Sequence, residues 1–154
     1  MDLSKKRELL SQQMKENLDL LGNSLNALEY SYNKCRKIGI KESYTPDELE
    51  SLEALTSRFA RTSDILTQKV FKTLFFLIQE EPQTFIDGAN LLEKIEIVNN
   101  ANQILNIREL RNEIAHEYKE NNLAVLFNDA LDYIPQLIEV IKNTNAYINN
   151  KKLT

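Results

Sequence analysis

The amino-acid sequence predicts an all-α protein, folded as an antiparallel bundle of four to five helices with two long helices at its N-terminal end. The chain of 154 residues holds only three glycines and three prolines, so few positions break a helix. Two long segments carry apolar residues at steps of three and four, the spacing of one helix face. The length suits a single domain, residues 1–154, with one core.

The first apolar stripe predicts a helix over about residues 4–37. Gly39 comes just after this stripe and suits the left-handed conformation that ends many helices. We therefore expect the chain to turn near residue 39. The stripe consists of Met14, Leu18, Leu21, Leu25, Leu28, Tyr32 and Cys35.

The segment Thr45–Glu48 predicts the start of the second long helix. Its threonine hydroxyl and its glutamate form the two halves of a capping box, with proline at the first helical position. An apolar stripe follows, interrupted by Thr62, until Glu80, Glu81 and Pro82 stop the helix. This stripe consists of Leu49, Leu52, Leu55, Phe59, Leu66, Val70, Leu74 and Leu77.

Shorter helices are expected in the second half of the chain. A third helix is predicted over about residues 85–98, and the polar segment Asn99–Asn102 separates it from a fourth. The fourth carries Ile107, Leu110 and Ile114 on its apolar face and is expected to end within residues 119–122. In the last stripe, residues 126–141, Pro135 either kinks one helix or separates two, and we favour a kink.

Composition limits the classes of function. A net charge of −4 argues against a broad basic surface that coats nucleic acid, although a small basic site fits this charge. Cys35 is the only cysteine and His116 the only histidine, so no disulfide and no Cys/His zinc site is expected, nor any cofactor. The N-terminus lacks a secretory pattern and the longest apolar run, Leu74–Ile78, is far too short to span a bilayer. We expect a cytoplasmic protein.

The segment Arg111–Tyr118 carries most of the functional argument, because it joins three chemically useful side chains within about two helical turns. Arg111 is able to hold a phosphate, His116 is able to move a proton, and Tyr118 offers a phenol for modification. Asn112 lies one turn before His116 and is placed to orient either His116 or the substrate.

A helical projection separates these side chains. At about 100° per residue from Arg111, the apolar residues of the fourth helix fall near 260–320°, and Tyr118 falls at their edge. Arg111, Ala115, Arg108, Asn112 and His116 then share one outward sector. Arg111 and His116 point too far apart to grip one small group from a single helix. Two copies facing each other across a two-fold axis are expected to bring two arginines and two histidines together.

Such a set of side chains suits metal-independent cleavage of RNA, which needs a base, an acid and a cation near the phosphate. The pattern Arg-x4-His-x-Tyr in Arg111–Tyr118 resembles the signature of HEPN domains, and in particular the HepT-like toxins that are paired with minimal nucleotidyltransferase antitoxins. The resemblance implies a homodimeric ribonuclease toxin with Arg111 and His116 catalytic in the dimer cleft. It also implies that the partner adenylylates Tyr118. We expect RNA, and neither DNA nor a membrane, as the target.

Plainer interpretations remain open. A non-catalytic HEPN-like module that binds nucleotide or a nucleotidyltransferase partner would use the same residues, and in a helical scaffold His116 would only close a helix. The simpler interpretation of Arg58, Arg61 and Asp64 is a solvent-exposed charged face of the second long helix. The alternative is that they line the dimer cleft. Phe71, Phe75 and Phe76 are expected to fill the end of the bundle, and Cys35 to be a buried thiol.

Overall fold

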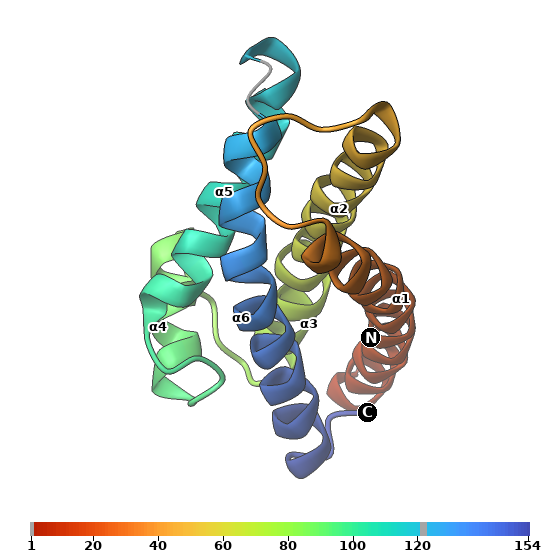
Figure 1. Ribbon diagram of the computed structural model, residues 1–154. Helices are drawn as coiled ribbons and strands as arrows, with labels where there is room; N and C mark the ends of the chain where they lie inside the picture. The colour runs from red at the N-terminus through yellow and green to blue at the C-terminus, as the bar shows by residue number, and fades with distance from the viewer. Residues whose placement is uncertain (1, 121–122) are drawn as a thin grey trace.

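The computed structural model describes the backbone of residues 2–120 and 123–154, and the side chains of residues 2–116 and 123–154. Throughout this part of the chain every regular element is a helix, so the expected all-α bundle is confirmed. Figure 1 shows a central rod of α2 and α3, with α1 on one side and α5 and α6 on the other, while α4 packs against α5 at the outside. None of the helices described is long and apolar enough to cross a membrane.

Helix α1 spans Leu3–Ile38, in close agreement with the predicted range. The side chain of Asp2 accepts a hydrogen bond from the backbone N–H of Lys5 and caps the first turn. At the other end, Gly39 has a φ of 73°, and its N–H donates to the carbonyl of Cys35 at 3.1 Å. A residue with a side chain would be strained there, which explains why glycine ends this helix.

The second long helical run consists of three elements in direct succession. Helix α2 spans Pro46–Ile65, the π-helical turn η1 spans Leu66–Val70, and α3 spans Phe71–Leu77. The predicted capping box is confirmed: Thr45 Oγ1 accepts from the N–H of Glu48, and Glu48 Oε1 accepts from the N–H of Thr45. The run ends at Leu77, somewhat before the predicted stop.

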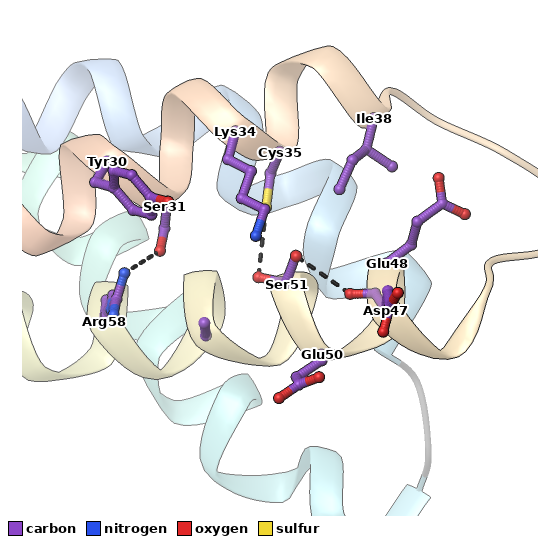
Figure 2. A pocket seen from close by; sticks show the side chains of 11 residues that line it. Tyr30, Ser31, Lys34, Cys35, Ile38, Asp47, Glu48, Glu50, Ser51 and Arg58 are labelled. Atoms are coloured by element: carbon purple, nitrogen blue, oxygen red, sulfur yellow. Dashed lines mark hydrogen bonds between the residues drawn. The ribbon is translucent and has the colours of Figure 1, made fainter.

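Polar contacts lie among the apolar ones along the packed faces of α1 and α2. Figure 2 shows the end of this interface, where Arg58 Nη1 donates to Ser31 Oγ at 2.7 Å and the Cys35 thiol donates to the carbonyl of Ser51 at 3.4 Å. Further along, Thr62 is fully buried and its hydroxyl pairs with that of Ser24 at 2.6 Å. Thr62 therefore interrupts the apolar stripe with a satisfied polar contact.

Thr62→Val is expected to lower the free energy of unfolding by about 1–3 kcal/mol, because it leaves the buried Ser24 hydroxyl without this partner. The double variant Ser24→Ala/Thr62→Val is expected to lose less free energy of unfolding than the two single variants lose together, because neither hydroxyl is then left buried without a partner. Urea unfolding of the four proteins in this cycle measures the coupling. Strict additivity would contradict the assigned contact.

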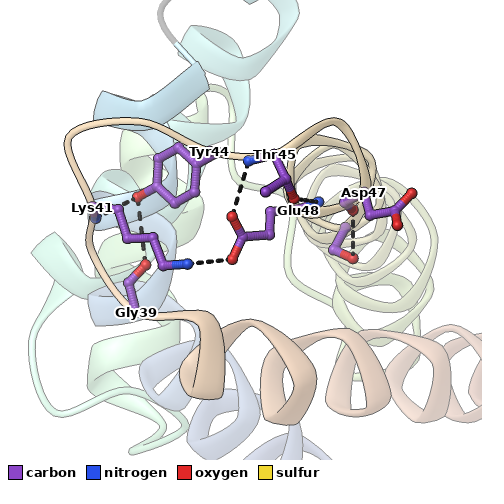
Figure 3. A network of polar contacts seen from close by, with 7 residues as sticks. Gly39, Lys41, Tyr44, Thr45, Asp47 and Glu48 are labelled. Carbon is purple, nitrogen blue, oxygen red and sulfur yellow. Dashed lines mark hydrogen bonds and ion pairs between the residues drawn. The ribbon is translucent and has the colours of Figure 1, made fainter.

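The connection between α1 and α2 is held by its own polar contacts, as Figure 3 shows. Lys41 pairs with Glu48, and the backbone N–H of Lys41 donates to the hydroxyl of Tyr44, which in turn donates to the carbonyl of Gly39. The ring of Tyr44 meets the buried ring of Phe127 edge-on, with centroids 6.1 Å apart. The connection thereby ties the α1–α2 pair to α6.

Helix α4 spans Phe85–Lys94, and Thr84 caps it by accepting from the N–H of Asp87. The predicted extension to residue 98 is wrong by four residues. Glu96 takes a left-handed conformation, with a φ of 66°, and the N–H of Ile97 closes the helix end on the carbonyl of Leu92. This closure does not use glycine or proline, so the sequence pattern carried no stop signal.

Helices α5 and α6 complete the bundle. Helix α5 spans Ala101–Glu120, beginning inside the predicted polar break, and the carboxylate of Glu93 accepts from the N–H of Ala101 at its start. Helix α6 spans Leu123–Asn150 as one element with Pro135 inside it, so the alternative of two separate helices is wrong. Ser11 of α1 donates to the carbonyl of Leu153, which fastens the chain end beside the start of α1.

Candidate functional site

The structure places the predicted site residues on the second half of α5 in the expected directions. Ile107, Leu110 and Ile114 are buried in the core, so they fix the rotation of the helix. On the other side Asn112 and His116 are exposed, as are Arg108 and Ala115. The predicted outward sector is thus confirmed by its burial pattern. Tyr118 belongs to α5, but its side chain lies outside the described residues.

Arg111 differs from the rest of the sector because its guanidinium is held by a residue of another helix. Arg111 Nε donates to Asp64 Oδ1 at 2.8 Å and Nη2 donates to Oδ2 at 2.9 Å, a bidentate pair between α5 and α2. The side chains of Arg111 and Asp64 are 30% and 42% exposed. The hydrogen bonds to Asp64 raise the pKa of Arg111, so its positive charge is permanent.

This pairing could not be read from the sequence. Asp64 lies 47 residues before Arg111, and the two meet only because α2 packs against α5. The charged face of α2 is nevertheless divided between two roles. Asp64 joins the candidate site, whereas Arg58 donates to Ser31 and Ala27 of α1. Of Arg58 and Asp64, therefore, Asp64 contacts a predicted site residue, Arg111, and Arg58 contacts α1.

A second cation of the sector stacks on an aromatic ring. The guanidinium carbon of Arg108 lies 4.1 Å from the ring centroid of Phe85, the first residue of α4. A cation at this distance from a ring is attracted by its negative face. Arg108 precedes Arg111 by three residues, so two oriented guanidinium groups follow each other along one side of α5.

Carboxylates border the sector on the side toward α6. Glu113 lies three residues before His116, and burial raises the pKa of Glu113, with further contributions from Asp129 of α6 and Glu109 of α5. Three like charges so close together disfavour ionisation of the central one. The Arg108–Arg111 side of α5 is therefore electrostatically more favourable to an anion than the side of Glu113.

Glu113→Gln is expected to stabilise the protein at pH 7 by a few tenths of a kcal/mol, since it removes a charge that is partly desolvated and weakly repelled by Asp129 and Glu109. The folded state raises the pKa of Glu113, so its contribution to stability is present below the pKa of the unfolded chain and is lost as pH rises through the higher folded value. The gain should therefore vanish below about pH 4. Melting temperatures at pH 7 and pH 3.5 measure it, with Glu16→Gln on the exposed face of α1 as control. A lower melting temperature of Glu113→Gln at pH 7 would contradict the repulsion.

A separate hollow on the described surface lies away from this sector. It encloses about 560 Å³ between the end of α1 and the start of α2 and is drawn in Figure 2. Cys35 lies fully buried at its wall, where burial raises the pKa of the thiol, so the expected buried thiol is confirmed. Lys34 and Arg58 face Asp47, Glu48 and Glu50 there, so the hollow has no dominant charge. It includes none of Arg111, Asn112 and His116.

No group of three or more His, Cys, Asp and Glu side chains in the described part of the chain is arranged to hold a metal ion. Comparison with protein-family models, with curated proteins and with solved structures finds no significant match to this chain. The HEPN resemblance therefore stays a prediction that rests on Arg111–Tyr118 and on the helical setting of these residues.

Proposed function

We propose that this chain is one subunit of a homodimeric, metal-independent endoribonuclease of the HEPN type, with Arg111 and His116 as catalytic residues. The observation that supports the proposal most is the arrangement on α5. Core contacts of Ile107, Leu110 and Ile114 leave Asn112 and His116 fully available on one outward sector, and Arg111 beside them is oriented by Asp64.

Asp64 fixes the plane of the Arg111 guanidinium without using all of its donors. A guanidinium has five N–H groups, and Asp64 accepts from Nε and Nη2, so among the described residues those of Nη1 are left for a phosphate oxygen. The ion pair also has no net charge. A single copy therefore attracts a phosphate weakly, and a second copy across a dimer axis adds the Nη1 donors of its own Arg111.

The proposed reaction is transesterification within RNA. The neutral His116 of one copy takes the proton of a 2′-hydroxyl, whose oxygen forms a new bond to the adjacent phosphorus. The bond from phosphorus to the 5′-oxygen breaks, and the protonated His116 of the other copy donates a proton to that leaving oxygen. Arg111 stabilises the charge that grows on the phosphate oxygens, and Asn112 orients His116. The products are a 2′,3′-cyclic phosphate and a free 5′-hydroxyl.

Regulation by a nucleotidyltransferase partner belongs to the same proposal. Tyr118 follows His116 by two residues on α5, so an adenylyl group on its phenol would add bulk and a negative phosphate beside the catalytic sector. A toxin silenced in this way fits the antitoxin pairing that the motif resemblance implies.

Purified protein mixed with single-stranded RNA in excess EDTA tests the proposal. We expect cleavage that the chelator does not reduce, that is lost in Arg111→Ala, and that ends in a cyclic phosphate detectable by mass spectrometry. Sedimentation at the assay concentration is expected to show a dimer. Cleavage that requires added Mg²⁺ would refute the mechanism, and a folded dimer that binds RNA without cutting it would favour the non-catalytic module.

A further inference from the structure

We propose that the hollow between α3 and α4 seats one unpaired base of the RNA whose phosphate is held at Arg111. The hollow encloses about 290 Å³ and is separate from the hollow of about 560 Å³ that is drawn in Figure 2. This inference rests on the proposed function, because it assigns the substrate's base to a surface next to the candidate phosphate site.

Three phenylalanine rings contribute to the lining of this hollow, together with polar and aliphatic side chains. Phe71 and Phe75 of α3 lie nearly parallel, with ring centroids 6.3 Å apart and planes inclined by 24°, and Phe85 of α4 contributes a third ring. Gly88 of α4 also lines it, and a Cβ atom built at this position would lie 3.5 Å from the ring of Phe75. The absence of a side chain at Gly88 therefore keeps the space next to that ring open.

The hollow and the candidate phosphate site are built from the same elements, and Arg108 links them. Gln68 lines the hollow from η1, four residues after Asp64, the partner of Arg111. Ile104 lines it from α5, seven residues before Arg111, which corresponds to about 10 Å along a helix. Between them, Arg108 stacks on the ring of Phe85 at the edge of the hollow. A strand of RNA held at Arg111 thus passes over Arg108 before it reaches the aromatic walls.

The chemistry of the walls favours a nucleobase over an aliphatic group. Aromatic rings stack with any base, and the guanidinium of Arg108 adds a cation beside the ring of Phe85. The side-chain amides of Gln68 and Gln83 at the rim both donate and accept, as the edges of bases require. A base in a duplex cannot enter, because its faces are covered by its neighbours, so the substrate class is single-stranded or looped RNA.

Binding of a 2′-O-methyl RNA tetranucleotide, which cannot be cleaved, tests the proposal independently of catalysis. Fluorescence anisotropy is expected to show that one abasic position weakens binding to the wild-type protein by about tenfold or more, the effect of one lost stacked base. Gly88→Leu, which fills the hollow, is expected to weaken binding of the intact tetranucleotide equally. In that variant the abasic tetranucleotide should bind no worse than the intact one.

Phe85→Leu is a second variant, which keeps apolar volume but removes one ring and is therefore expected to weaken binding of the intact tetranucleotide. The control is Ile86→Ala, because Ile86 is the exposed neighbour of Phe85 and does not line the hollow, so its binding should be unchanged. Equal affinity of the wild-type protein for intact and abasic tetranucleotides, or no binding of either, would overturn the base pocket even if RNA is cleaved. A base-dependent affinity without RNA cleavage would instead leave the pocket standing and refute the nuclease.

Discussion

Replacing His116 by alanine is expected to lower the rate of RNA cleavage by about 10²- to 10⁴-fold, the usual contribution of general acid–base catalysis. In the proposed dimer the substitution removes both the base that takes the 2′-hydroxyl proton and the acid that protonates the leaving oxygen. His116 is exposed on α5, so its loss should leave the melting temperature almost unchanged. Initial cleavage rates at saturating RNA, together with thermal unfolding curves, measure both quantities.

Asn145→Ala is the matched control, since Asn145 is likewise an exposed polar residue on a helix but lies on α6, far along the chain from the motif. It should cleave RNA at the wild-type rate. If His116→Ala keeps that rate as well, the proposed catalytic role is refuted. A loss of cleavage accompanied by an equal loss of folded protein would instead assign His116 a structural role.

Phe127→Ala is expected to have the largest effect on stability, lowering the free energy of unfolding by about 3–5 kcal/mol. The ring of Phe127 is fully buried near the start of α6, and the ring of Tyr44 meets it at an interplanar angle of 89°. Truncation leaves a cavity and removes the aromatic contact that anchors the α1–α2 connection. A loss of this size is a large share of the stability of an ordinary domain.

Val125→Ala gives the comparison for Phe127, because Val125 lies two residues earlier on α6 and is 64% exposed. Its cost should stay below about 0.5 kcal/mol, as for most surface substitutions. Urea unfolding followed by circular dichroism measures both variants. Similar costs for the two would contradict the assignment of Phe127 to the core.

Helix starts were the most predictable part of the fold. Thr45 and Glu48 form the expected capping box, and the apolar stripe of α1 closely indicated the limits of this helix. Its buried face was predicted only in part, because Leu18, Leu25 and Tyr32 are partly buried whereas Asn17, Ser24 and Ser31 are buried beside them. Gly39 ends α1 as its sequence position indicated. These features are local, so a few neighbouring residues suffice to determine them.

Helix ends without glycine were not predictable. Gln79 and Glu96 follow the ends of α3 and α4 with φ values of 59° and 66°, a conformation that residues with a Cβ seldom adopt. At Glu96 tertiary packing favours this conformation, because the next residue, Ile97, is buried in the core. The expectation that Phe76 fills the end of the bundle was also wrong, since Phe76 is 61% exposed.

The candidate site was predictable as far as one helix determines it. The period of α5 placed Asn112 and His116 outward and Ile114 inward, because that inference needs only the helical repeat. The contacts of Arg111 with Asp64 and of Arg108 with Phe85 join different helices, and no local pattern encodes them. The role of Tyr118 remains a prediction.

The π-helical turn η1 corresponds to an unusual spacing of apolar and buried residues, which can be interpreted only once the structure is known. From Thr62 the buried positions advance by four residues three times in succession, to Leu66, Val70 and Leu74. In a regular α-helix each such step overshoots a full turn by about 40°, so the stripe would rotate away from the core. A wider turn absorbs the excess and keeps these residues buried.

The extra residue of η1 therefore changes the direction in which α3 presents its side chains relative to α2. In an uninterrupted α-helix, Phe71 would point within about 20° of Asp64, on the half-exposed side that meets Arg111. With one residue taken up by the wide turn, the two directions separate by about 120°, and Phe71 turns into the interior. The angular offset between the ion pair and the aromatic wall is thus set by the winding of the backbone at η1.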